Sequence, residues 1–162
     1  MTVSAPTASA QPDQEQKVTA AILYNLARFS DWPVDRFENK GDQFVICALA
    51  DPDMTRALTM LESKDIKGRA IKIHAISEND EITRKCHVVF QADSDASQLD
   101  YKALAKLNIL SVGNSKAYLE NGGGMAIHRR SNTLGFSISK TNMQMAGITP
   151  SSKILKLAAK VQ

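Results

Sequence analysis

The sequence predicts an α/β fold, with a mostly parallel sheet flanked by helices, a C-terminal antiparallel hairpin and a terminal helix. Two observations predict this class. Apolar runs of strand length alternate with segments of helical periodicity through most of the chain, and two short strand-like runs around a polar turn follow near its end. The chain has 162 residues, of which 43% are hydrophobic and 23% charged, which is typical of one folded domain.

Residues 1–12 are predicted to form a disordered tail, and residues 13–162 a single domain. The tail consists of small, uncharged residues and has neither the basic start nor the apolar centre of a signal peptide. Its composition resembles the start of a mature exported protein.

The first element of the domain is predicted to be a helix from Asp13 to Ser30. Its apolar positions fall four, four and three residues apart, which gives a single stripe. Pro33 disfavours the helical conformation at Trp32, so the helix is expected to end near Ser30. The stripe consists of Val18, Ile22, Leu26 and Phe29.

The middle of the chain is predicted to alternate strands and helices. Residues 44–50 form a continuous apolar run between polar turns, which suits a strand buried on both faces. The elements that follow are expected to continue the sheet through right-handed crossovers. In chain order they are a helix at 55–61, a strand at 70–76, a strand at 86–91, a helix at 99–107, a strand at 109–112 and a helical turn at 115–119.

The pattern changes at the glycine run of residues 122–124, which predicts a turn with unusual backbone angles. Residues 125–129 and 134–139 flank a polar turn and predict a hairpin. A final helix is predicted to begin at a serine cap, either Ser151 or Ser152. Its predicted apolar face is Ile154, Leu157, Ala158 and Val161.

Charge is unevenly placed along the chain, whose net charge is +3. No Asp or Glu follows Glu120, while six Lys and Arg residues do. This end suits either a solvated surface or contact with an anionic ligand, partner or lipid surface. Nucleic-acid binding is not expected, because the basic residues are sparse and few aromatic residues lie among them. The longest uncharged apolar run has seven residues, whereas a membrane span needs about 20.

Motifs of the common enzyme classes are incomplete. The glycine run lacks a following Gly-Lys-Ser/Thr, the first strand is not followed by GxGxxG, and GxSxG is absent. Asp51 and Asp53 resemble part of the acidic cluster of a phospho-receiver domain, but the expected acceptor aspartate is displaced. The three histidines, His74, His87 and His128, lack metal-binding spacing. We predict no catalytic residues, no metal and no cofactor.

The two cysteines, Cys47 and Cys86, lie in the first and third predicted strands. These strands are neighbours in a doubly wound sheet of order 2-1-3. The residues are therefore compatible either with a disulfide, which persists only in an oxidising compartment, or with two buried thiols of a cytosolic protein.

Several stretches together resemble one family. They are ILYNLARFSDWP at 22–33, FVICALAD at 44–51, IKGRAIKI at 66–73, CHVVF at 86–90 and GGGMAIHRRSNTLGFSISKTNMQMAGITPSSKILKLA at 122–158. Their order and combination resemble the YfiR family over roughly residues 15–160.

The resemblance implies a periplasmic, non-enzymatic repressor. It would bind the periplasmic part of an inner-membrane diguanylate cyclase, lower cyclic-di-GMP and biofilm formation, and form a homodimer. Cys47 and Cys86 match a cysteine pair of the family, which favours the disulfide. A second pair found in some members near the closing hairpin has no counterpart here.

Two sets of binding residues are predicted. A partner surface is expected at Ile148, Pro150, Lys153, Ile154 and Leu155, with their burial in the core as the alternative.

Trp32, Arg36 and Lys153 are the predicted ligand site, because an aromatic ring with two cations suits a small aromatic or anionic ligand. The alternative is a core tryptophan with surface cations. The rival functions are a periplasmic ligand-sensing domain for a histidine kinase or another membrane receptor, and an undetected hydrolase.

Overall fold

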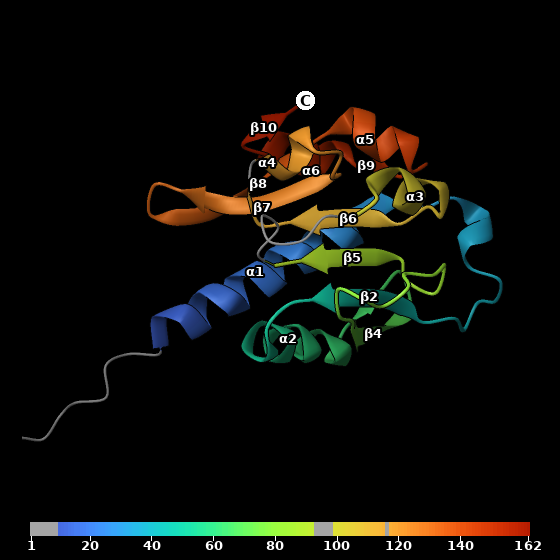
Figure 1. Ribbon diagram of the computed structural model, residues 1–162, viewed down its shortest axis with the longest axis horizontal. Helices are drawn as coiled ribbons and strands as arrows, with labels where there is room; N and C mark the ends of the chain where they lie inside the picture. Colours follow the sequence, from blue (N-terminus) through green and yellow to red (C-terminus); the bar gives the residue numbers. More distant parts are fainter. Residues whose placement is uncertain (1–9, 93–98, 116) are drawn as a thin grey trace, which may run out of the picture.

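The computed structural model describes residues 10–92, 99–115 and 117–162, and it confirms a mixed α/β fold (Figure 1). An eight-stranded sheet has the order β10-β8-β7-β6-β5-β2-β4-β3. Its parallel centre is formed by β4 (Arg69–Ala75), β2 (Phe44–Leu49), β5 (Val88–Gln91) and β6 (Leu110–Gly113). The neighbouring strands β4, β2 and β5 realise the predicted 2-1-3 order.

The predicted hairpin is also confirmed. It comprises β7 (Met125–Arg130) and β8 (Thr133–Ile138), which pair antiparallel, while β7 pairs parallel with β6. The ribbon extends past the rest of the sheet in Figure 1. A Glu15–Arg129 ion pair of 2.7 Å joins it to α1 (Ala10–Arg28).

Helix α1 begins three residues before its predicted start and ends two residues before its predicted end. Its buried face is also rotated relative to the predicted stripe, because Val18 is 37% exposed and only Leu26 of that stripe is fully buried. The apolar run at residues 20–23 allows two overlapping stripes, and the structure uses the one with small alanines, which permit close packing. The buried face is Ala20, Leu23, Leu26 and Ala27.

The remaining helices follow the predicted order with different bounds, and the helix predicted at 55–61 begins three residues earlier. Helix α2 (Pro52–Thr59) continues into the 3₁₀ turn η2 (Met60–Ser63), and α2 packs against α1. Next come α3 (Tyr101–Lys106), with Asp100 as its cap, and α4 (Ala117–Glu120). Helix α5 (Lys140–Met145), capped by Ser139, was not predicted.

The end of the chain corrects the predicted terminal helix. Helix α6 (Ser152–Leu157) is capped by Ser151, whose side chain accepts from the Ile154 amide at 3.4 Å. The chain then becomes extended, and β10 (Lys160–Val161) pairs parallel with β8. This pairing satisfies backbone groups on the sheet edge that a longer helix would leave open.

Short strands complete the fold. β1 (Ser30–Asp31) pairs antiparallel with β9 (Thr149–Pro150), and β3 (Asp65–Ile66) pairs with β4 across the Lys67-Gly68 turn. The β1–β9 pair joins the end of α1 to the segment that precedes α6.

The glycine run is a structural turn, as predicted. Gly122 has φ +112°. A Cβ at Gly123 or at Gly113 would overlap the ring of Tyr118, which is buried between them. Burial holds the pKa of Tyr118 well above its usual value.

Candidate functional site

The segment between α1 and β2 forms one wall of a cavity of about 260 Å³ at the amino-terminal ends of β2 and β4. Helix α1 ends at Arg28, and after β1 and Pro33 the 3₁₀ turn η1 (Val34–Arg36) leads the chain towards β2. The lining combines aromatic rings with cations and includes Trp32, Phe37, Phe44, Lys67 and Arg69.

The aromatic side chains of this wall form one packed cluster. Trp32 meets Phe44 edge-on, with ring centroids 5.1 Å apart. His87 stacks on Phe37 at 4.4 Å and on Phe44 at 5.2 Å. The Trp32 indole nitrogen donates to the His87 carbonyl oxygen at 3.2 Å. These contacts fix the orientation of the Trp32 indole ring. The cavity therefore has an aromatic wall that is already formed without a ligand.

His87 is held in the neutral form. Its Nδ1 accepts a hydrogen bond from the Val45 amide at 3.0 Å, which requires that nitrogen to be unprotonated. Burial first, and then the positive charge of Arg36, lower its pKa to about 4. The imidazole ring therefore acts as an aromatic packing group near neutral pH.

The charged side chain of Arg36 binds backbone carbonyl groups. The side chain is buried, with Nη2 donating to the Cys86 carbonyl at 2.5 Å and Nε to the Asn108 carbonyl at 3.3 Å. Burial, with a smaller contribution from Arg84, lowers its pKa to about 10, so it remains charged. Arg36 thus ties the segment to β5 and lies outside the cavity lining.

Lys153 is not joined to Trp32. Its ammonium lies over the ring of Phe29, 4.7 Å from the centroid. Of the predicted trio of Trp32, Arg36 and Lys153, only Trp32 belongs to the lining of the cavity.

The cations at the cavity are instead Lys67 and Arg69, which sequence reasoning missed. Lys67 donates to the Ser30 carbonyl at 2.7 Å and forms an ion pair with Asp31. The Arg69 guanidinium lies 3.9 Å from the Phe37 centroid, and like that of Arg36 it also binds backbone, since its Nη1 donates to the carbonyl oxygens of Asn39 at 2.9 Å and Asp42 at 3.0 Å. The turn that begins β4 places both cations, and their distance in sequence from Trp32 gave no signal of this.

The residues of the predicted partner surface differ in how far they are buried. Ile148 and Ile154 are each only 1% exposed and belong to the main core, so the prediction that they extend past the core is wrong for these two. They fill the space between α6, β9 and the sheet, where apolar burial stabilises the domain. Lys153 is exposed, and Pro150 and Leu155 are half-buried.

The Cys47–Cys86 disulfide is present, and this confirms that prediction. The two Cα atoms lie 5.7 Å apart, and both residues are buried between neighbouring strands. The bond lies in a second apolar cluster with Val89, Leu104 and Ile109. It ties the start of β5 to β2, directly beside the carbonyl that Arg36 binds.

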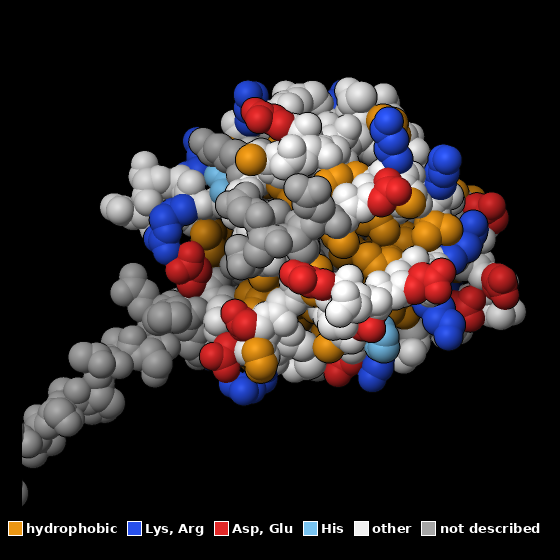
Figure 2. Space-filling model, viewed as in Figure 1, with side chains coloured by type: hydrophobic (Ala, Val, Ile, Leu, Met, Phe, Trp, Pro, Cys, Tyr) orange, Lys and Arg blue, Asp and Glu red, His pale blue; other side chains and the backbone are white. Residues whose placement is uncertain are grey.

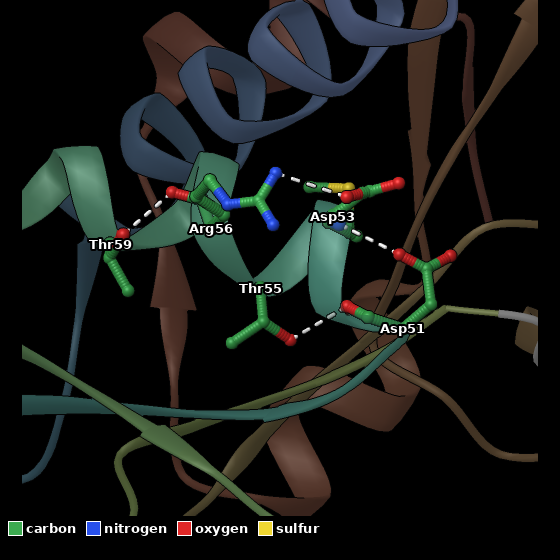
Figure 3. Close-up of polar contacts among 6 residues, drawn as sticks. Asp51, Asp53, Thr55, Arg56 and Thr59 are labelled. Atoms are coloured by element: carbon green, nitrogen blue, oxygen red, sulfur yellow. Dashed lines mark hydrogen bonds and ion pairs between the residues drawn. The ribbon is translucent and has the colours of Figure 1, made fainter.

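The acidic pair after β2 is a helix cap (Figure 3). Asp51 accepts from the Met54 amide at 2.8 Å, and its carbonyl accepts from the Thr55 hydroxyl at 2.9 Å. Asp53 forms an ion pair with Arg56 at 3.1 Å. The contacts drawn in Figure 3 thus account for both carboxylates through the first turns of α2.

The histidines lie apart from one another. His74 is exposed on β4, His87 is in the aromatic cluster, and His128 bonds Ser137 Oγ at 2.8 Å. Within residues 10–92, 99–115 and 117–162, no group of three His, Cys, Asp or Glu side chains could hold a metal ion. No helix in these ranges is long and apolar enough to cross a membrane.

The fold and the cavity describe a small, disulfide-bonded α/β domain with an aromatic and cationic recess. The chain belongs to the YfiR/HmsC-like family, whose model matches residues 16–159. This membership supports a periplasmic, regulatory role in cyclic-di-GMP signalling. No curated protein matches the sequence.

Two solved structures share the fold. One is a conserved domain protein from Vibrio cholerae O1 biovar El Tor, with a TM-score of 0.63 and 11% identity. The other is the ABC domain in complex with L-Trp from Streptococcus pneumonia, with a TM-score of 0.54 and 14% identity. Each alignment covers 91% of this chain but only 60% of the other chain.

Proposed function

We propose that this protein represses a membrane diguanylate cyclase by binding the periplasmic part of that enzyme. The observation that carries the proposal is the family match over residues 16–159. The disulfide agrees with it, because such bonds persist in oxidising compartments such as the periplasm.

Repression requires only that the protein bind the inactive form of the cyclase more tightly than the active form. A difference of about 1.4 kcal/mol shifts the equilibrium tenfold. No reaction at the repressor is needed.

We place the cyclase contact on the exposed side of α6 and the preceding segment, at Pro150, Lys153 and Leu155. Lys153 is exposed at the end of the chain that has no acidic residues, and its ammonium is held over Phe29. A cation beside half-buried apolar groups suits an acidic and apolar patch on a partner.

The test measures cyclic-di-GMP in cells that produce the cyclase with either wild-type repressor or Lys153→Glu. Lys153→Glu should raise cyclic-di-GMP towards the level without repressor, while the melting temperature of the purified variant stays near that of wild type. Lys40→Glu, an exposed lysine on another segment, serves as the matched control and should repress normally.

Unchanged repression by Lys153→Glu would remove this surface from the proposal. If wild-type repressor neither lowers cyclic-di-GMP nor binds the purified periplasmic part of the cyclase, the repressor function itself is wrong.

A second candidate function is the sensing of a small aromatic or anionic ligand, either for the cyclase or for a histidine kinase or other receptor. The cavity beside Trp32, Lys67 and Arg69 favours it, since rings and cations together suit a planar anion. One structural neighbour is a domain in complex with L-Trp, as its description states.

Trp32 is the single tryptophan of the chain, so its fluorescence reports on the cavity directly. Titration with benzoate and with nucleotides should change this emission and raise the melting temperature if the cavity binds such anions. Lys67→Glu should abolish both effects. Absence of either effect in the wild type would remove this candidate.

A further inference from the structure

A second hollow, of about 540 Å³, lies at the amino-terminal ends of β2 and β5. It shares no lining residue with the cavity beside Trp32. His87 lines this hollow and stacks on Phe37, which lines the cavity, so the two rings lie between the two spaces. A ligand of the hollow would therefore occupy a different site from a ligand of the cavity.

Three cations from two distant segments line the hollow. Arg36 comes from η1, while Arg84 and Lys85 come from the loop before β5. The Arg84 side chain also reaches the η1 segment, because its Nη2 donates to the Asp35 carbonyl oxygen at 3.4 Å. Within the part of the chain that the structure describes, none of these three cations forms an ion pair. Their positive charges therefore remain available to a ligand.

Arg36 retains hydrogen-bond donors that such a ligand can use. The residue is only 5% exposed, and its Nε and Nη2 donate to backbone carbonyl groups. Its Nη1 forms no hydrogen bond to any residue that the structure describes. This nitrogen carries two N–H donors, and donors of buried side chains normally have a partner. The unused nitrogen of a buried guanidinium therefore indicates that an acceptor binds in the hollow.

The charges of Arg36 and Arg84 favour an anion as this acceptor. After burial, the positive charge of Arg84 is the strongest cause that lowers the pKa of Arg36, and Asp35 opposes it with a smaller effect. An anion bound by both guanidinium groups offsets their mutual repulsion. Guanidinium groups bind carboxylate and phosphate oxygens through paired N–H donors, so an oxyanion fits best.

Carboxylates in the same lining limit the size of the anion. Asp35, Glu38 and Asp42 also line the hollow. Figure 2 shows basic and acidic side chains side by side along the right edge of the molecule, where the segment before β2 lies in Figure 1. A polyanion that filled the hollow would be repelled by these carboxylates, whereas an anion with one charged group can contact Arg36 and Arg84 alone.

We propose that Arg36 and Arg84, assisted by Lys85, bind a small oxyanion with a single charged group, of the phosphate or carboxylate type. This site goes beyond the repression of a cyclase and does not depend on it. It is also separate from the cavity beside Trp32, so a failure at one site leaves the other unaffected.

The test is a titration of the full chain with phosphate and, separately, with acetate at constant ionic strength, with chloride as the reference salt. NMR spectra follow the chemical shifts of the backbone amides of Arg84 and Lys85 and of the arginine Nε–H groups. These shifts should saturate with phosphate, with acetate or with both, but not with chloride. Comparison of the two series distinguishes a phosphate site from a carboxylate site.

Arg84→Ala should raise the dissociation constant about tenfold, because it removes a charged donor group. Glu38→Gln should lower the dissociation constant about twofold, because it removes a repelling carboxylate at an exposed position. Lys67→Glu in the other cavity and Arg130→Ala at an exposed position of β7 are the controls and should bind like wild type. The spectra also show whether each variant is folded.

Wild-type shifts that are the same with phosphate, acetate and chloride overturn the proposal. Saturable binding that Arg84→Ala leaves unchanged places the anion elsewhere and also overturns it. An equal loss in either control variant would show a general effect of net charge, which would overturn the assigned site. A loss confined to Arg84→Ala supports the site. Tighter binding by Glu38→Gln supports the limit to a small anion, and unchanged binding by that variant overturns this limit.

Discussion

The Arg36 guanidinium donates a 2.5 Å hydrogen bond to the carbonyl oxygen of Cys86, one of the two disulfide-bonded residues. A side chain from the turn after α1 thereby fixes the start of β5. The next residue, His87, receives the Trp32 indole on its own carbonyl. The disulfide, Arg36 and Trp32 therefore all fix the backbone at Cys86 and His87.

Arg36→Met should lower the free energy of unfolding by about 2 to 3 kcal/mol, because the buried carbonyls of Cys86 and Asn108 lose a charged donor. Urea denaturation measures the change. Arg56→Met, which removes an exposed ion pair, is the control and should cost less than about 1 kcal/mol. Equal effects of the two substitutions would contradict the role assigned to Arg36.

Removal of the disulfide by Cys47→Ala with Cys86→Ala should lower the free energy of unfolding by about 3 to 4 kcal/mol. The bond spans a sequence separation of 39 residues, and its loss frees that loop in the unfolded chain. Wild-type protein alkylated without reductant should gain no mass, and after reduction it should gain two labels. Labelling of both cysteines without reductant would show that the bond is absent in solution.

Stability should fall as the pH is lowered from about 6.5 to about 4 because of His87. Its pKa is lowered to about 4 in the folded protein, so the unfolded chain takes up the proton first and is favoured at lower pH. Neutral His87 contributes its full stabilisation above pH 6.5. Between pH 6.5 and pH 4 the free energy of unfolding falls by up to about 3 kcal/mol.

Denaturation across this pH range provides the measurement for His87. His87→Gln should flatten the slope, whereas His74→Gln, at an exposed position on β4, should retain it. A slope that survives unchanged in His87→Gln would assign the effect to other groups.

Gly123→Ala should destabilise the domain by about 1 to 3 kcal/mol, because its Cβ would overlap the buried ring of Tyr118. Gly41→Ala provides a matched comparison, since a Cβ at Gly41 would meet nothing within 4 Å. Thermal or urea unfolding of both variants gives the comparison. If Gly123→Ala is as stable as Gly41→Ala, the ring must be able to move away.

Much of the fold could be predicted because its signals are local. The run at residues 44–50 is apolar throughout, as a strand buried on both faces requires, and the polar turn near Ser131 marks the hairpin. The terminal helix was predicted too long for a non-local reason. Its last residues, Lys160 and Val161, pair with β8 at the edge of the sheet. The periodicity of the sequence contains no information about this pairing.

The candidate site was predicted only in part for the same reason. Trp32 was identified from the end of the first helix, but Lys67 and Arg69 reach it from a turn more than thirty residues away. Arg36 looked like a free cation because the carbonyls that it binds belong to distant residues. Ile148 and Ile154 looked available to a partner because burial depends on what packs against them.

The sequence by itself determined the class of fold, the family and the strands that carry the two cysteines, because each depends on residue type and local order. Which cations line the cavity beside Trp32 and which apolar residues are buried became evident from the three-dimensional arrangement alone. Those properties depend on contacts between distant segments, where packing and backbone pairing select one arrangement among many that local preference allows.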